Sequence, residues 1–295
     1  MELGSRVSTR KNILILGATG YLGSRLFDYL DNNNYKVYAL VRRTSICDQI
    51  APDRVIYMDE DLIKFVINNN IQVVINLVAD YGRAGGSNLD IIASNEIFPL
   101  KILQNCLEVN QDIVFINTDT SLPKETNVYS MSKAHFVNYA RLITKKTRVS
   151  FLNIKLEHFF GPLEPKTRFI SFLINSFLDD VDAINLTKGE QARDFIYIDD
   201  VLVAYLIILD NLDKVDYTQD LSLGSGVGFN VRELAISIKQ YCKNHTTELK
   251  FGALAYRDPE AMYLVADNSK LRELGWKPKL SLEQSLMICI ESYKR

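Results

Sequence analysis

The sequence lacks the features that would point to a membrane or to nucleic acid. No uninterrupted apolar run in its 295 residues reaches the roughly 18 to 20 residues that a membrane-spanning helix needs. The net charge is −2, so there is no basic excess to attract nucleic acid or an anionic membrane surface. The polar start of the chain also lacks the apolar core of a signal peptide. We therefore expect a cytoplasmic protein that acts on a small molecule, with a disordered extension over residues 1–10.

Cysteine is scarce as well. The four cysteines are widely separated along the chain, at Cys47, Cys106, Cys242 and Cys289. Their separations match neither a zinc site nor a disulfide framework, so we expect reduced structural thiols and no bound metal. Apolar residues, by contrast, make up 47% of the chain, which permits a full hydrophobic core. A chain of this length fits one α/β unit with a smaller appended lobe.

Short apolar runs alternate with segments of helical period through the first half of the chain. The predicted strands are Asn12–Leu16, Lys36–Val41, Arg54–Tyr57, Val73–Val78, Ile113–Ile116 and Phe151–Leu156. The predicted helices between them are Tyr21–Leu30, Leu62–Asn69, Asn95–Val109 and Val128–Thr144. This alternation predicts an α/β fold with a doubly wound parallel sheet.

The second half of the chain is less regular. It has a predicted helix over Phe169–Leu178, a short strand over Phe195–Tyr197 and a helix that starts near Asp199. We expect a dinucleotide-binding domain over residues 11–162 and a smaller mixed substrate lobe over residues 163–295. With no linker of low complexity between them, the two are expected to share one cleft.

A glycine-rich turn joins the first predicted strand to the first predicted helix. Glycine recurs at every third position from Gly17 to Gly23. Glycines at this spacing allow a tight turn, a close approach of the backbone to a pyrophosphate, and contact between helix and strand. The helix N-terminus then faces the phosphate charge. The pattern predicts a Rossmann-like site for a dinucleotide, with contacts from Gly17, Thr19, Gly20, Tyr21, Leu22 and Gly23.

Tyr129 and Lys133 lie four residues apart in a predicted helix and therefore share one of its faces. A phenol with an unperturbed pKa of about 10 is a weak acid near neutrality. A neighbouring ammonium group favours the phenolate and lowers that pKa. Alone, the pair could be an exposed surface pair. Together with the upstream glycine turn, it predicts an oxidoreductase in which Tyr129 transfers a proton and both residues lie against the cofactor.

The end of the second predicted strand bears on the choice of cofactor. In sites for NAD, an acidic residue at this position accepts hydrogen bonds from the adenine ribose. Here Val41 takes that place, and Arg42 and Arg43 follow it. Guanidinium groups attract the additional ribose phosphate of NADP. We therefore expect NADPH/NADP as the cofactor, the alternative being that both arginines are solvated loop charges.

With these motifs in place, the chain resembles the extended short-chain dehydrogenase/reductase family of nucleotide-sugar epimerases, dehydratases and reductases. The resemblance covers nearly the whole chain and includes Asn95, Gly161-Pro162, Gly189–Phe195, Tyr256–Pro259 and Leu274–Pro278. It implies a nucleotide-sugar substrate and a homodimer. Within the family, the chain looks most like the reductases of CDP-linked 4-keto-3,6-dideoxyhexoses. The segments that carry this likeness are Asn117–Thr120, Leu156–Pro162 and the block around Arg193.

The resemblance also implies roles for single residues. Thr118 takes the position of the catalytic serine or threonine that holds the substrate carbonyl. The interval to Tyr129 is short, which leaves Thr120 and Ser121 as alternatives. Asn95 joins the cofactor site. The implied substrate contacts are Asp119, His158, Arg193 and Arg257, with the two arginines on the diphosphate. The alternatives are surface ion pairs for the arginines and a structural role for the histidine.

The segment after Thr118 bears on the reaction. Nucleotide-sugar 4,6-dehydratases usually have an Asp-Glu pair there, whereas here Asp119 is followed by Thr120, so the glutamate base is missing. We predict NADPH-dependent reduction of the C4 keto group of a nucleotide-linked 4-keto-6-deoxy or 3,6-dideoxyhexose. By resemblance the nucleotide is CDP and the pathway is deoxysugar and surface-polysaccharide biosynthesis. The alternatives are an epimerase or dehydratase, and a non-catalytic NADP-binding regulator.

Overall fold

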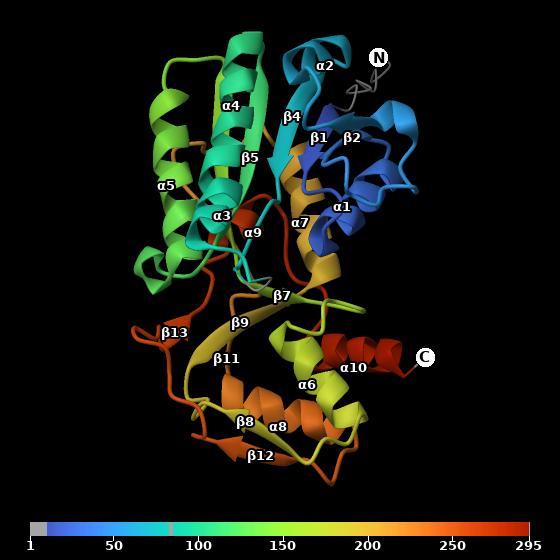
Figure 1. Cartoon of the computed structure of the whole chain (residues 1–295), viewed down its shortest axis with the longest axis vertical. Coiled ribbons are helices and arrows are strands. Elements are labelled where there is room, and N and C mark those ends of the chain that lie inside the picture. Colours follow the sequence, from blue (N-terminus) through green and yellow to red (C-terminus); the bar gives the residue numbers. More distant parts are fainter. Residues whose placement is uncertain (1–10, 83–84, 295) are drawn as a thin grey trace, which may run out of the picture. The chain divides into compact units, whose positions relative to one another are not determined.

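The computed structural model describes residues 11–82 and 85–294 (Figure 1). The extension predicted over residues 1–10 lies outside the described residues. The chain divides into two compact units, of which the first comprises residues 11–118 with 135–152 and the second comprises 119–134 with 153–294. Residues 119–134 and 153–162 thus group with the second unit, although we expected them in the first domain. The common cleft stays a prediction.

One parallel sheet of seven strands runs in the order β10-β6-β5-β4-β1-β2-β3. Its strands are β1 (Asn12–Leu16), β2 (Lys36–Val41), β3 (Val55–Tyr57), β4 (Ile71–Asn76), β5 (Ile113–Thr120), β6 (Val149–Leu156) and β10 (Leu221–Leu223). The Rossmann-like doubly wound fold is therefore confirmed, and the seventh strand, β10, was not predicted. The strand order reverses between β1 and β4, and sheets of this type bind ligands outside the carboxyl ends of the strands at such a point.

A continuous core joins the sheet of the first unit to three helices. They are α2 (Leu62–Asn68), α4 (Phe98–Val109) and the second half of α5 (Val128–Ile143). The rings of Phe115, Phe136 and Phe151 meet in this core with centroids 5.9 to 6.1 Å apart. Outside this cluster, α1 (Tyr21–Asn32) buries leucines at every fourth position, Leu22, Leu26 and Leu30, and contacts β1 and β2.

The segment before α4 differs from the predicted helix Asn95–Val109. A short helix, α3 (Asn88–Ile92), leads into a π-helical turn over Ala93–Ile97, and α4 begins only at Phe98. Pro99 lies in the first turn of α4, where a missing backbone N–H is tolerated. The π-helical turn holds Asn95 in the buried interior.

The second unit is built around β9 (Ala192–Tyr197). This strand pairs antiparallel with β11 (Gly228–Asn230) and parallel with β7 (His158–Phe160) and β13 (Tyr263–Leu264). A separate pair joins β8 (Ala183–Leu186) to β12 (Glu248–Phe251). The helices of this unit are α6 (Phe169–Leu178), α7 (Ile198–Asp210), α8 (Val231–Tyr241), α9 (Ser269–Glu273) and α10 (Leu282–Tyr293), of which α6, α8 and α10 contact one another (Figure 1). The smaller mixed sheet that we expected is present.

Within the described ranges, no helix combines the length and the apolarity that a bilayer crossing requires. The same residues contain no group of histidine, cysteine and carboxylate side chains arranged to hold a metal ion. All four cysteines are free thiols. Burial raises the pKa of Cys106 and of Cys289 to about 12, which keeps both thiols protonated at neutral pH.

Candidate active site

The glycine turn of the first unit lies at the point where the strand order reverses. Gly17 has a φ of 81°, and a Cβ added there would lie 3.2 Å from the backbone nitrogen of Val78, just after β4. The N–H of Gly20 donates to the Gly17 carbonyl at 3.0 Å, which closes the turn. A Cβ on Gly23 would collide with the same carbonyl oxygen. Gly17 and Gly23 are thus required by the local geometry.

The turn leaves the N-terminus of α1 open. Gly20 is the N-cap and has no side chain to accept the first backbone N–H groups of the helix. Those groups and the helix dipole suit a phosphate. Thr19 is exposed, Tyr21 is half-buried and Leu22 is buried, so only the backbone of Leu22 is available to a ligand. The site therefore fits the pyrophosphate of a dinucleotide.

The two arginines after β2 have different surroundings. Arg43 pairs with Asp59 at 3.1 Å and with Glu60 at 3.2 Å, and its guanidinium lies 3.9 Å from the centroid of the Tyr57 ring. Arg42 is exposed and makes no such contact in the described part of the chain. Arg42 is consequently the arginine that is available to a ribose phosphate, whereas Arg43 is already bound by carboxylates.

Asn95 uses its whole side-chain amide on the protein backbone. Its Oδ1 accepts a hydrogen bond from the N–H of Asp80 at 2.9 Å, and its Nδ2 donates to the carbonyls of Asp80 at 2.8 Å and Ile91 at 2.9 Å. The side chain is 1% exposed. Asn95 therefore fixes the loop after β4, and its expected role in the cofactor site would be exerted through that loop.

Lys133 and Tyr129 come together on α5. The Nζ atom of Lys133 lies 5.9 Å from the centroid of the Tyr129 ring. Lys133 is 3% exposed and Tyr129 is 7% exposed. Burial lowers the pKa of Lys133 to about 8, and the negative charge of Asp119 opposes this shift. The lysine is therefore still mostly cationic at pH 7, the state that favours a phenolate beside it.

Asp119 is engaged through both of its carboxylate oxygens. Oδ1 accepts a hydrogen bond from the N–H of Thr120 at 2.8 Å, and Oδ2 accepts one from Nδ2 of Asn153 at 3.2 Å. The same amide group of Asn153 donates to Asp220 at 3.0 Å. Asp119 is 9% exposed. Its contacts thus hold it within the second unit and near the charge of Lys133, and its expected contact with substrate stays a prediction.

Three hydroxyl groups follow one another at the end of β5. Thr118 is half-buried in the first unit. In the second unit, Oγ1 of Thr120 accepts a hydrogen bond from the N–H of Leu122 at 3.2 Å and keeps its own proton to donate. Ser121 instead donates its proton to Oε2 of Glu157 at 2.7 Å. Ser121 is therefore poorly placed to donate to a carbonyl, and Thr118 and Thr120 remain the two candidates.

Arg193 and Arg257 both belong to the second unit, and their charges repel each other. Arg193 is 7% exposed, donates to the carbonyl of Ala192 at 2.8 Å, and is hydrogen-bonded to Glu260. Burial lowers the pKa of Arg193, the charges of Glu260 and Glu157 raise it, and the charge of Arg257 lowers it further. Two neighbouring guanidinium groups, one buried and one exposed, suit an anion with more than one phosphate group.

Asp194, next to Arg193, holds two other segments of the second unit, one at Ser225-Gly226 and one at Ala266. Its carboxylate accepts hydrogen bonds from the N–H and Oγ of Ser225 at 2.8 and 2.6 Å, from Gly226 at 2.8 Å, and from Ala266 at 3.2 Å. It is fully buried, and burial raises its pKa while these four donors lower it. The sequence analysis assigned Asp194 no role, although an acid beside a predicted ligand arginine was a usable signal.

Glu157 is a second residue that the sequence analysis missed. It follows β6 directly, and its side chain is 5% exposed. Nδ1 of His158 lies 3.9 Å from Oε2 of Glu157, too far for a hydrogen bond, and is buried without a hydrogen-bond partner among the described residues. The His158 ring lies 5.7 Å from that of Phe195. The structure thus gives His158 a polar neighbour and an unused nitrogen.

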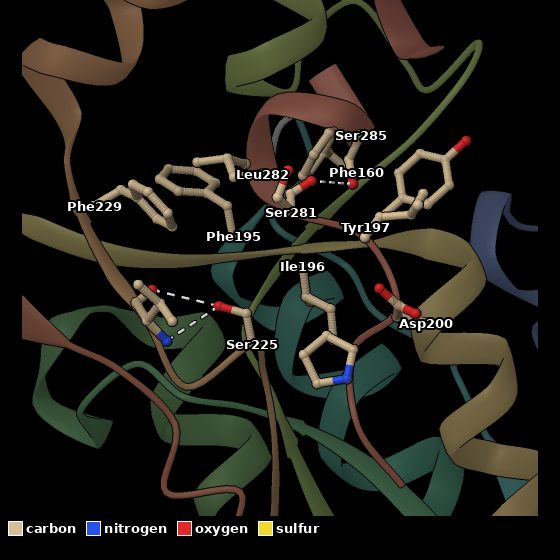
Figure 2. Close-up of a pocket in the computed structure, with 13 residues that line it drawn as sticks. Phe160, Phe195, Ile196, Tyr197, Asp200, Ser225, Phe229, Ser281, Leu282 and Ser285 are labelled. Atoms are coloured by element: carbon tan, nitrogen blue, oxygen red, sulfur yellow. Dashed lines mark hydrogen bonds between the residues drawn. The ribbon is translucent and has the colours of Figure 1, made fainter. Parts of the chain in front are cut away.

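A pocket of about 190 Å³ lies elsewhere in the second unit (Figure 2). Its walls are mostly apolar and include the aromatic rings of Phe160, Phe195 and Tyr197, with Asp200 also lining the pocket. Asp200 accepts a hydrogen bond from the N–H of Lys279 at 2.9 Å, and burial raises its pKa. None of the four expected substrate residues lines this pocket, so we assign it no part in the reaction.

The glycine turn, the strand order and the buried tyrosine and lysine together define a dinucleotide-binding oxidoreductase with a Rossmann-like fold. The sequence profile of the NAD dependent epimerase/dehydratase family matches residues 13–224. The chain therefore belongs to the NAD dependent epimerase/dehydratase family, and the resemblance to extended short-chain dehydrogenases/reductases is confirmed.

Curated relatives cover almost the whole chain. The CDP-abequose synthase of Salmonella typhimurium is 29% identical over 289 residues, which are 94% of this chain and 96% of the relative. A putative UDP-glucose 4-epimerase of Methanocaldococcus jannaschii is 24% identical and covers 93% of this chain and 95% of its own. Among solved structures, the UDP-glucose 4-epimerase of Thermotoga maritima with UDP-glucose has a TM-score of 0.81 at 20% identity, covering 96% of this chain and 98% of its own. The structural likeness shows the fold.

Proposed function

We propose that the protein is an NADPH-dependent reductase of the C4 keto group of a nucleotide-linked 4-keto-6-deoxy or 3,6-dideoxyhexose. We further propose that the nucleotide is CDP and that the product serves deoxysugar synthesis for a surface polysaccharide such as an O-antigen. The similarity to CDP-abequose synthases over nearly the full chain supports the substrate class. Family membership supports an enzyme that works with a nicotinamide dinucleotide.

The observation that carries the choice of reaction is the end of β2. The strand ends at the buried Val41, and Arg42 rather than an acid follows it. Arg42 is exposed, and no described residue makes a contact with it that would prevent it from binding a phosphate. An acid at this position would bind the free ribose hydroxyls of NAD, whereas a guanidinium binds the phosphate of NADP. NADPH is a reductant consumed in each turnover, which fits a reductase better than an enzyme that recycles its NAD.

In the proposed reaction, each catalytic residue has a separate role. The bound cofactor supplies hydride to the sugar carbonyl carbon. Tyr129 delivers a proton to the carbonyl oxygen, and the charge of Lys133 stabilises the phenolate that remains. The hydroxyl of Thr118, or alternatively that of Thr120, donates a hydrogen bond to the same oxygen as negative charge develops there.

The proposed diphosphate site consists of Arg193 and Arg257. Arg193 is buried, and the two positive charges interact unfavourably until an anion binds. Glu260 at present binds Arg193. A diphosphate would replace or supplement that carboxylate, with bidentate hydrogen bonds from the guanidinium groups. His158 and Asp119 are the further substrate contacts that we propose.

An epimerase is the second candidate. The similarity to a putative UDP-glucose 4-epimerase favours it, and so does the fold shared with NAD-bound epimerase structures. A 4,6-dehydratase is disfavoured because Asp119 is followed by Thr120, so the glutamate that would act as base is missing. A non-catalytic NADP-binding regulator would not require a buried Tyr129 and Lys133.

The test is a panel of CDP-, dTDP-, GDP- and UDP-linked 4-ketosugars with the purified protein. Oxidation of NADPH, followed at its absorbance band, is expected with a CDP-linked 4-ketosugar. Interconversion of UDP-linked hexoses without net NADPH consumption would instead identify an epimerase. Cofactor binding without turnover of any ketosugar would favour the regulator.

We also propose a homodimer formed through α5. Tyr139 and Leu142 on this helix are 48% and 62% exposed, a high exposure for apolar side chains on a regular helix. Light scattering should give twice the monomer mass of 33.7 kDa, and a Leu142→Glu variant should give the monomer mass. A monomeric wild-type protein would contradict this proposal.

A further inference from the structure

We propose that Glu157 and Ser121 recognise a hydroxyl group on the sugar of the nucleotide-sugar substrate, an inference that rests on the function proposed above. The Glu157 carboxylate accepts a hydrogen bond from a sugar hydroxyl, and the Ser121 hydroxyl fixes the direction of that carboxylate. Glu157 then determines specificity for the sugar and leaves the chemical step to Tyr129.

The carboxylate of Glu157 is buried, and only one of its two oxygens accepts a hydrogen bond from the described residues. Its Oε2 accepts the Ser121 proton at 2.7 Å, whereas its Oε1 accepts no hydrogen bond from the part of the chain that the structure describes. The side chain is 5% exposed, and Oε1 is not among the buried atoms without a partner in the described part of the chain, so this oxygen is accessible to a ligand. Burial of a carboxylate costs free energy unless its oxygens are hydrogen-bonded. A ligand hydroxyl would supply the missing donor.

His158 adds a second unused polar group at the same place. Its buried Nδ1 lies 3.9 Å from Oε2 of Glu157 and has no hydrogen-bond partner among the described residues. A hydroxyl group is both a donor and an acceptor. One sugar hydroxyl could therefore donate its proton to Glu157 and accept a hydrogen bond from Nδ1–H of His158. A carbonyl or a methyl group could not donate to the carboxylate.

The position of the pair within the second unit points to the sugar rather than to the base. Ser121 follows β5 and Glu157 follows β6, so both lie at carboxyl ends of strands of the sheet, where ligands bind in this type of fold. The charge of Glu157 acts on Arg193, the proposed diphosphate ligand. Ser121 also begins the segment that leads to Tyr129. In a nucleotide sugar, the hexose is attached to the diphosphate and contains the reacting carbon.

The competing explanation is that Glu157 only balances the charge of Arg193. The two explanations differ in which ligand responds to a change at Glu157. A sugar contact affects ligands that carry a hexose, whereas a counter-charge affects the diphosphate of every ligand. Binding of CDP alone and of CDP-glucose to the same variants therefore separates the explanations.

The experiment is a calorimetric titration of CDP and CDP-glucose into wild type, Glu157→Gln, Ser121→Ala and a control variant, Glu164→Gln. The control also replaces a buried glutamate of the second unit that pairs with an arginine, Arg168, at 3.0 Å. Loss of a charge-assisted hydrogen bond should weaken CDP-glucose about 10-fold in Glu157→Gln, with CDP unchanged. Ser121→Ala should weaken CDP-glucose about 3-fold to 10-fold, again with CDP unchanged. The control should change neither.

An equal change for CDP and CDP-glucose, whether a gain or a loss, would overturn the inference and leave Glu157 as a counter-charge for Arg193. Unchanged CDP-glucose affinity in both variants would overturn it as well. If Glu157→Gln fails to fold, Ser121→Ala decides alone, since it retains the buried carboxylate. If wild type does not bind CDP, the proposed function fails first, an outcome that the CDP titration reveals by itself.

Discussion

We expect the buried Lys133 to make the folded protein more stable as the pH rises above 8. Burial lowers the pKa of this lysine from 10.5 to about 8. Below pH 8 the side chain is charged in both the folded and the unfolded chain, and the shift corresponds to a cost of about 3 kcal/mol, at 1.36 kcal/mol per pKa unit. Between pH 8 and 10.5 Lys133 loses its proton in the folded chain but keeps it in the unfolded chain. The cost of burying the charge therefore falls, and the free energy of unfolding rises.

The perturbation that isolates this effect is Lys133→Met, which keeps a long side chain and cannot titrate. The free energy of unfolding of wild type minus that of the variant should rise by about 2 kcal/mol between pH 7.5 and pH 9.5. Groups that do not interact with Lys133 titrate alike in both proteins and cancel in the difference. Urea unfolding followed by circular dichroism at the two pH values measures it.

A control replaces an exposed lysine, Lys124→Met, whose side chain is 61% exposed. The difference in the free energy of unfolding between wild type and Lys124→Met should change by no more than about 0.5 kcal/mol between the two pH values. If the difference for Lys133→Met were equally independent of pH, the reasoning would be refuted, because burial would then not shift the pKa of Lys133. The enzyme should also lose activity above pH 8 if the charge of Lys133 supports Tyr129.

Three further outcomes are expected. Tyr129→Phe should lower turnover at least about 100-fold and leave NADPH binding intact, because it removes only the proton donor; wild-type turnover would show that another group delivers the proton. Arg42→Ala should reduce the preference for NADPH over NADH by about 1.5 to 3 kcal/mol, and Arg43→Ala by less because acidic neighbours already bind it; calorimetry with both cofactors measures this, and equal affinities in wild type would contradict it. Arg193→Ala and Arg257→Ala should each raise the KM for the nucleotide sugar about 10-fold to 100-fold without changing NADPH affinity, and an unchanged KM in steady-state kinetics would mean that neither arginine binds the diphosphate.

Side-chain periodicity predicted the regular elements well. The limits of β1, β2 and α6 agree with the sequence analysis to the residue, because each is an apolar segment bounded by polar residues or by the glycine turn. The π-helical turn over Ala93–Ile97 was not predicted. Its one extra residue per turn leaves the apolar pattern of the helix almost unchanged, so the sequence contains no clear signal for it.

The candidate site was predicted less completely than the fold. Tyr129 and Lys133 were found because their partners lie within one turn of helix. Glu157 was missed because its hydroxyl partner, Ser121, lies 36 residues away in the sequence. The carboxylate on Arg193 was missed for the same reason, since Glu260 follows 67 residues later. Contacts over such distances depend on how the chain folds back, which a single sequence does not reveal.

The carboxylate of Asp194 has a consequence for the order in which the second unit folds. Its donors follow it by 31, 32 and 72 residues, the last of them at Ala266. Closing a loop of that length costs conformational entropy before the contact stabilises anything. The contact with Ala266 can therefore form only after most of the chain has been synthesised, whereas the contacts with Ser225 and Gly226 require only the residues up to 226. A nascent chain that ends before Ala266 would hold this acid without its full set of donors.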